Sequence, residues 1–267
     1  MELGIQGRWA LVTGSSKGLG FGCAQALARE GVNLVVNGRS RETLNIACEK
    51  LKRLASREAS ITILGVEADI TTPEGRDAVF DVKGGPGRDF DILVTNSGGP
   101  PMGDFREWDR DIWLAAIEAN MLTPIELIKA TVDGMADRGF GRIINITSSA
   151  VRSPIEALGL SNGARSGLTG FMAGLARSSI ASKGVTINNI LPGKFDTDRL
   201  LSSRSIAAKK TGKPTHQLIE EEVSSIPVRR LGKPEEFGAF CAFLCSVHAS
   251  YINGQNLLID GGMVRGV

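Results

Sequence analysis

The stretch TGSSKGLG (residues 13–20) overlaps the end of the short apolar run ALVTG (10–14) and leads into FGCAQALARE (21–30), whose apolar residues recur at helical spacing. A glycine-rich turn between a strand and a helix is typical of dinucleotide-binding proteins, because its backbone can approach a pyrophosphate at a partly positive helix N-terminus. The glycines follow the pattern GxxxGxG rather than GxGxxG. The turn residues that we expect to contact a cofactor are Gly14, Ser16, Lys17, Gly18, Leu19 and Gly20.

Outside this turn, the chain alternates between short apolar runs and longer runs of helical periodicity. The runs that predict strands lie at 10–14, 32–38, 61–70, 90–99, 141–149, 184–193 and 254–262. The runs that predict helices lie at 21–30, 41–58, 72–84, about 109–137, 161–183 and 234–246. The alternation predicts an α/β fold: one Rossmann-type, doubly wound domain over residues 1–267, with a seven-stranded parallel sheet flanked by helices.

One segment, residues 198–228, does not fit the alternation and is rich in serine, lysine and glutamate. A long excursion at the carboxyl end of a strand usually covers a substrate site. We therefore expect a substrate lid or loop here, with a plain surface insertion as the alternative.

The overall composition is that of an ordinary globular protein, with 42% apolar and 22% charged residues. The net charge of +2, from 31 basic and 29 acidic residues, predicts no nucleic-acid partner. No apolar run approaches the ~20 residues of a membrane span, and the start of the chain does not resemble a signal peptide. The four cysteines form no CxxC pair and accompany only two histidines, so we expect no metal site and reduced thiols in the cytoplasm.

The end of the second predicted strand indicates which dinucleotide binds. A site selective for NAD places a carboxylate here to hold the ribose 2′-hydroxyl. This sequence has Gly38 at that place, followed by Arg39, and Lys17 lies in the nearby turn. Two cations and no carboxylate suit a 2′-phosphate, so the predicted cofactor is NADP(H). The alternative is two solvated surface cations.

Taken together, these motifs resemble the short-chain dehydrogenase/reductase (SDR) family, in particular its branch similar to 3-oxoacyl-[acyl-carrier-protein] reductases. The resemblance covers nearly the whole chain and rests on TGSSKGLG (13–20), ADI (68–70), TNSGG (95–99), Asn120, IINITSS (143–149), LPGKFDT (191–197), RLGKPEEF (230–237) and INGQNLLIDGG (252–262). It implies further cofactor contacts at Asp69, Ile70, Asn96, Ser97, Gly98, Pro192, Gly193 and Thr197. The turn at 95–98 departs from the family's NNAG at two of four positions.

The family's active site combines Asn, Ser, Tyr and Lys, and this chain matches only half of it. Asn120 and Ser148 match the first two. Ser161, thirteen residues after Ser148, stands where the family has tyrosine, and Arg165 stands in place of lysine. Serine is a far weaker acid than a phenol and arginine keeps its proton, but we expect Arg165 still to bind the cofactor through its ribose hydroxyls and to stabilise negative charge. The family's proton delivery is therefore lost.

Other groups could deliver a proton instead: Lys194, His216 or Arg152, each of which is more simply an exposed loop residue. The helix that carries Ser161 also has Gly163, Gly167, Gly170 and Gly174 on one stripe. Close packing should offset the cost of these glycines. In the family this helix forms a subunit interface, so the resemblance implies a homodimer or homotetramer.

Three functions fit these observations. The first is an NADP(H)-dependent oxidoreductase that acts on a small-molecule carbonyl or alcohol, with proton delivery unlike that of the family. The second is an inactive NADP-binding homologue that serves as a sensor or assembly partner. The third is non-redox chemistry, a dehydration or isomerisation, in the same pocket. Ser148, Asn120, Ser161 and Arg165 are the predicted catalytic residues.

Overall fold

A computed structural model describes residues 2–54 and 60–265 of the chain. Its centre is a parallel sheet in the order β3-β2-β1-β4-β5-β6-β7. The strands are β1 (Trp9–Val12), β2 (Asn33–Gly38), β3 (Ile63–Glu67), β4 (Ile92–Thr95), β5 (Gly141–Ile146), β6 (Val185–Pro192) and β7 (Asn256–Ile259). The predicted fold class, a doubly wound parallel sheet of seven strands, is confirmed.

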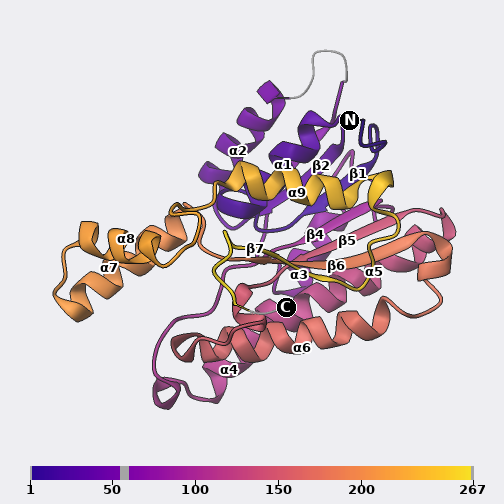
Figure 1. Ribbon diagram of the computed structural model, residues 1–267. Helices are drawn as coiled ribbons and strands as arrows, with labels where there is room; N and C mark the ends of the chain where they lie inside the picture. The colour runs from indigo at the N-terminus through magenta and orange to yellow at the C-terminus, as the bar shows by residue number, and fades with distance from the viewer. Residues whose placement is uncertain (1, 55–59, 266–267) are drawn as a thin grey trace.

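Helices cover both faces of this sheet (Figure 1). Their bounds are α1 (Gly18–Arg29), α2 (Arg41–Leu54), α3 (Pro73–Phe80), α4 (Arg110–Ile117), α5 (Thr123–Asp137), α6 (Gly159–Leu175), α7 (Asp198–Thr211), α8 (Thr215–Ser224) and α9 (Pro234–Cys245). The helix expected over 41–58 is thus described as far as Leu54, and residues 55–58 lie outside the described part of the chain.

The alternation of side chains along each strand divides the core into two layers. Val12, Val36 and Ile144 point to α1, α2 and α9, whereas Leu11 and Ile143 point to α3, α5 and α6. The strands carry apolar residues on both faces, as expected for a parallel sheet that is buried on both sides. Because both faces of the sheet are packed, the carboxyl end of β6, which leads to α7, is held in a fixed position.

The helix expected over 72–84 ends earlier, at Phe80, the one expected over 21–30 begins earlier, at Gly18, and two further predicted helices differ from those observed. The helix expected over 109–137 is interrupted by a π-helical turn, η2 (Glu118–Leu122), which contains Asn120. Such turns occur frequently at functional sites, because they re-aim side chains. The helix expected over 161–183 begins earlier, at Gly159, and ends at Leu175.

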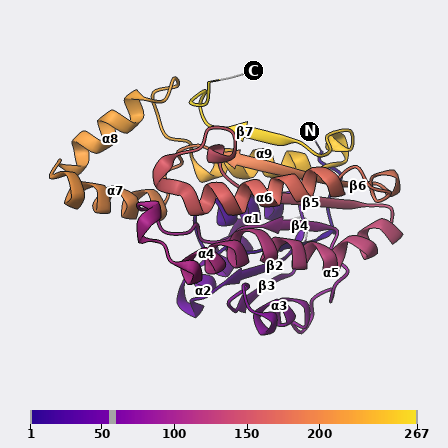
Figure 2. The same cartoon turned by 90° about the horizontal axis from the view of Figure 1, so that it is seen from below.

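The segment at 198–228 is largely helical, not an irregular loop. It forms α7 and α8, which stand out from the body of the molecule in both views (Figures 1 and 2). Glu222 on α8 pairs with Arg204 on α7 at 2.6 Å and with Lys194, beyond β6, at 3.1 Å. This ionic cluster ties the helix pair to the strand that it follows.

Candidate active site

The candidate site lies where the strand order reverses, between β1 and β4. The chain leaves these two neighbouring strands toward opposite faces of the sheet, which opens a crevice at their carboxyl ends. The turns after β1, β4, β5 and β6 carry most of the predicted site residues to this edge.

The glycine-rich turn after β1 requires glycine for two distinct reasons. Gly14 and Gly18 have φ values of 54° and 62°, which L-residues with side chains rarely adopt. Gly20 has no such constraint, but a Cβ there would lie 2.5 Å from the carbonyl oxygen of Gly14. Gly20 thus lets α1 pack closely on the turn; Ser16 and Lys17 precede the helix, and Leu19 lies in its first turn.

Asn96 joins the turns after β1 and β4. Its backbone N–H donates to Thr13 Oγ1 at 2.8 Å, and Thr13 Oγ1 donates to the Asn96 carbonyl at 2.7 Å. The Asn96 side chain donates from Nδ2 to the carbonyl of Gly14 at 2.9 Å. These bonds hold the two loops at a fixed separation, and the Cβ position of Gly98 next to them has no atom within 4 Å.

Three cations lie at the end of β2 or in the turn after β1, and their surroundings differ. Gly38 is buried, and a Cβ there would lie 3.0 Å from the side chain of Ser16. Arg39 is exposed and forms no hydrogen bond or ion pair with any residue that the structure describes. Arg41, by contrast, is bound to Glu67 at 2.8 Å, and Lys17 to Asp198 at 3.3 Å.

Asp69 and Ile70 lie just after β3. Ile70 is buried in the core, whereas Asp69 is exposed. The Asp69 carboxylate accepts hydrogen bonds from the hydroxyl and the backbone N–H of Thr71, at 2.8 and 3.0 Å. These bonds lower the pKa of Asp69, so it is ionised at neutral pH and can accept a bond from an amino group.

The turn after β6 returns to the glycine-rich loop. Pro192 pairs with Ile259 of β7, and a Cβ at Gly193 would lie 2.6 Å from the Cβ of Asp260. The methyl group of Thr197 lies 3.7 Å from the Cβ position of Gly18. The segment that the resemblance assigns to the nicotinamide therefore faces the segment assigned to the phosphates.

Asn120 and Ser148 are both placed by local backbone bonds. Asn120 is buried, donates from Nδ2 to the Ala116 carbonyl at 3.2 Å and accepts at Oδ1 from the Ser97 hydroxyl at 3.2 Å. Ser148 follows β5, and its Oγ accepts from the backbone N–H of Ala150 at 3.1 Å. Because that bond uses an oxygen lone pair, the Ser148 hydroxyl keeps its proton for another acceptor.

Ser161 and Arg165 lie one turn apart on α6 and are both buried. The Ser161 hydroxyl forms no hydrogen bond within the described chain. Arg165 donates from Nη1 to the carbonyls of Ile146 and Thr147, at 2.6 and 2.9 Å. Burial, and secondarily the charge of Arg199, lowers the pKa of Arg165 to about 10, so the guanidinium remains protonated at neutral pH.

Arg199 was not among the residues predicted from the sequence. It lies in the first turn of α7 and donates to the carbonyls of Gly99 and Pro100, at 2.8 and 3.1 Å. Although the residue is partly exposed, desolvation of its guanidinium lowers the pKa of Arg199. Nothing in the sequence indicates this position, because it depends on where α7 leaves β6 and meets a turn one hundred residues earlier.

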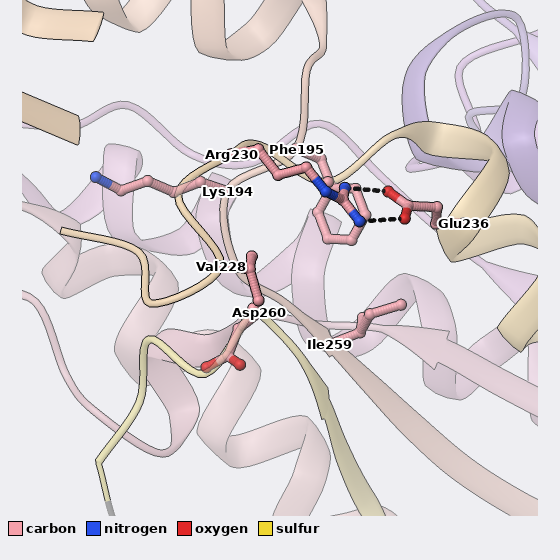
Figure 3. Close-up of a pocket in the computed structure, with 9 residues that line it drawn as sticks. Lys194, Phe195, Val228, Arg230, Glu236, Ile259 and Asp260 are labelled. Carbon is pink, nitrogen blue, oxygen red and sulfur yellow. Dashed lines mark hydrogen bonds and ion pairs between the residues drawn. The ribbon is translucent and has the colours of Figure 1, made fainter. Parts of the chain in front are cut away.

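The other candidate proton donors are either ion-paired or exposed. Lys194 is paired with Glu222, and His216 and Arg152 are exposed. Lys194 lines a pocket beside the β7 end, which Figure 3 shows together with the bidentate pair of Arg230 and Glu236. None of the residues predicted to bind the cofactor or to act in catalysis lines this pocket.

The described residues include no group of three or more His, Cys, Asp or Glu side chains that could hold a metal ion. Within the same residues, no helix is both long and apolar enough to cross a membrane.

Taken with the sheet order, the glycine-rich turn and the polar residues at its edge define a Rossmann-type, dinucleotide-binding fold. Residues 14–264 match the family described as enoyl-(acyl carrier protein) reductase. The acetoacetyl-CoA reductase of Cupriavidus necator is 32% identical over 97% of this chain and 99% of its own. The 3-oxoacyl-[acyl-carrier-protein] reductase FabG of Vibrio cholerae is 30% identical over 98% of this chain and 99% of its own.

Among solved structures, L-sorbose reductase from Gluconobacter frateurii, complexed with NADPH and L-sorbose, superposes with a TM-score of 0.91. It is 30% identical, and the match covers 100% of both chains. The chain belongs to the short-chain dehydrogenase/reductase family and is an oxidoreductase of that type.

Proposed function

We propose that the protein is an NADP(H)-dependent oxidoreductase that interconverts a small-molecule carbonyl compound and its alcohol, without the Tyr–Lys pair of its family. The observation that carries this proposal is the Ser148 hydroxyl, whose oxygen accepts from the Ala150 N–H and whose proton therefore remains for another acceptor, which we take to be the substrate carbonyl oxygen. Asn120, anchored through Ser97, completes the half of the family's site that this chain retains.

The residues present fit a bound NADP(H). Gly18 has a positive φ and no side chain, so backbone can approach a pyrophosphate here, and the N-terminus of α1 supports its negative charge. Arg39, which has no ion pair within the described chain, and Lys17 would bind the 2′-phosphate. Asp69, Ile70, Asn96, Ser97, Gly98, Pro192, Gly193 and Thr197 are the further residues that we assign to the cofactor. The bound cofactor supplies or accepts a hydride.

The remaining chemistry belongs to the protein's own side chains. When a carbonyl carbon gains hydride, its oxygen becomes an alkoxide that must be stabilised and protonated. Ser148 donates a hydrogen bond to that oxygen, and the buried cation Arg165 stabilises its charge in a low-dielectric setting. We assign the proton relay to Ser161, because its hydroxyl has no partner in the described chain and can accept one proton while it donates another.

We further propose that the protein is a homodimer or homotetramer joined through α4, η2 and α6. The helices α4 and α6 lie side by side (Figure 2), and η2 contacts both. Gly163 and Gly167 pack against Trp113 and Met121 of the same chain, so only half of the glycine stripe is open to a partner. The Cβ positions of Gly170 and Gly174 have no atom within 4 Å, and the exposed apolar side chains of this face are Leu114, Leu122 and Phe171.

The proposed site of action is the cytoplasm, with which the four buried, unpaired thiols agree.

The experiment that tests the redox function follows NADPH oxidation with a panel of ketones and 3-oxoacyl thioesters. We expect turnover by the wild type and a kcat lower by about 10²- to 10³-fold in Ser148→Ala, with NADPH binding unchanged in a thermal-shift assay. If the wild type is inert and the double variant Ser161→Tyr/Arg165→Lys gains turnover, the proposed reductase activity is wrong. That outcome supports an NADP-binding protein without redox activity, or non-redox chemistry.

A further inference from the structure

Arg165 is a buried cation whose bonds within the described chain are all to neutral groups. Its exposed fraction is 8%, and its only acceptors there are the carbonyl oxygens of Ile146 and Thr147. No carboxylate among the described residues forms an ion pair with it. Taking a charge out of water costs much free energy unless an opposite charge lies close to it. The two carbonyl bonds satisfy part of the guanidinium, and its charge has no counter-ion among the described residues.

A second cation approaches the same region from a different element. Arg199 is held by the carbonyls of Gly99 and Pro100, so its guanidinium bridges α7 and the turn after β4. The turn that holds Arg199 follows β4, which pairs with β5, and Arg165 is bound at the carboxyl end of β5. In agreement with this placement, the charge of Arg199 helps to lower the pKa of Arg165. Two like charges repel one another, and an anion bound between them would offset this repulsion because it attracts both.

Neutral donors stand beside the two cations. Ser161 precedes Arg165 by one helical turn, on the same face of α6, and its hydroxyl has no hydrogen-bond partner in the described chain. The guanidinium of Arg165 uses only Nη1 for its backbone bonds, which leaves Nε and Nη2 to donate as a pair. Two parallel N–H groups match the two oxygens of a carboxylate.

The phosphates of the cofactor have a separate place. They belong to the N-terminus of α1 and to Lys17 and Arg39, at the ends of β1 and β2, whereas Arg165 lies on α6 against the end of β5. The anion at Arg165 and Arg199 is accordingly assigned to the substrate.

Resting on the redox function proposed above, we propose that the substrate is an oxo acid whose carboxylate lies against Arg165 and Arg199, with its carbonyl oxygen at Ser148. Arg165 and Arg199 then determine specificity for an anionic substrate. In the reduction, hydride adds to the carbonyl carbon, one proton adds to its oxygen, and the carboxylate is unchanged in the 2- or 3-hydroxy acid that results.

A binding experiment tests the anion site without turnover. Oxalate, a carboxylate that cannot be reduced at this site, is titrated calorimetrically into the protein with NADPH present, at constant ionic strength. We expect oxalate binding to weaken by about 10- to 100-fold in Arg165→Met and in Arg199→Gln, the loss of a charged hydrogen bond. Arg106→Gln removes an exposed cation from the loop after β4 and serves as the matched control.

Because Arg165 is buried, Arg165→Met can disturb folding. Two further variants keep the test decisive: Arg199→Gln, at a more exposed position, and Arg165→Lys, which keeps the positive charge. Oxalate binding of equal strength in Arg199→Gln, Arg106→Gln and wild type contradicts the proposal. So does an affinity for inorganic phosphate that exceeds that for oxalate and depends on both arginines, since it indicates a phosphate ester.

Turnover separates this inference from the redox function. NADPH oxidation is compared for 2-oxobutanoate, its methyl ester and butanone. We expect kcat/KM to be at least about tenfold higher for the acid, and Arg199→Gln to raise KM for the acid alone. If butanone and 2-oxobutanoate react equally well in the wild type and in Arg199→Gln, the redox function stands and the carboxylate site fails. If oxalate binds through the arginines and nothing in the oxo-acid panel is reduced, the redox function fails and the anion site stands.

Discussion

The Nζ atom of Lys17 lies 3.3 Å from the Oδ2 atom of Asp198, which joins the glycine-rich turn to the first residue of α7. Both side chains are mostly exposed, so the pair contributes at most ~1 kcal/mol. Its position matters more than its strength. Because Lys17 is one of the two cations proposed for the 2′-phosphate, the cofactor and Asp198 compete for the same ammonium group.

Replacement of this carboxylate should strengthen cofactor binding. In Asp198→Asn we expect the Kd for NADPH to fall by up to about fivefold, since ~1 kcal/mol of competition is removed. Calorimetric titration with NADPH and NADH measures this, and the NADH affinity should not change. Asp196→Asn, an exposed carboxylate two residues earlier, is the control. Equal NADPH affinities in Asp198→Asn and wild type would show that Lys17 does not take part.

Arg39 should determine the preference for NADP(H). Arg39→Ala removes charge-assisted hydrogen bonds to a 2′-phosphate and should raise the Kd for NADPH by about 10- to 100-fold, with little effect on NADH. Arg41→Ala is the matched control, because Arg41 is already bound to Glu67. Thermal-shift titrations with both nucleotides compare the variants. A tighter complex with NADH than with NADPH in the wild type would contradict the assignment.

These cofactor residues could be predicted from the sequence because their positions depend on local features. The turn at Gly14 and Gly18 follows directly from the strand before it and the helix after it, and both positive φ values need glycine. The alternation of strands and helices likewise predicts the sheet, because each parallel strand needs a crossover helix. Asn120 was found through resemblance, although the π-helical turn around it leaves no mark in the periodicity.

The part of the site that the sequence did not predict depends on long-range geometry. Segment 198–228 has a polar composition without a strong apolar stripe, so its helices were not predicted. Ion pairs of Glu222 join α8 to Arg204 of α7 and to Lys194, which follows β6. Arg199 reaches Gly99 only because α7 begins where the end of β6 approaches the turn after β4. No local pattern encodes that approach.

The exposed apolar face of α6 should hold subunits together. Phe171, of which 42% is exposed, lies beside Gly170 and Gly174, where a partner helix can approach closely. Phe171→Glu should place a charge in this interface and shift the protein toward monomers, while Ser178→Glu, beyond the end of α6, should not. Sedimentation velocity at micromolar concentration distinguishes these states. A monomeric wild type would remove the proposed interface altogether.

The pair of Arg230 and Glu236 should make stability depend on pH in the acid range. The two bonds from Arg230, at 2.8 and 2.7 Å, lower the pKa of Glu236 to about 2, against an ordinary value of 4.5. A depressed carboxyl pKa contributes stability that is present above the unfolded value and is lost as the pH falls through the folded value. The melting temperature of the wild type should therefore exceed that of Glu236→Gln at neutral pH, and the difference should shrink between pH 4.5 and about 2.

Because the pair is exposed, the difference should be modest and should decrease with salt. Glu235→Gln, which alters the same first turn of α9 without touching the pair, should melt like the wild type throughout. A wild-type advantage that persists below pH 2 would mean that the ionised carboxylate is not its source.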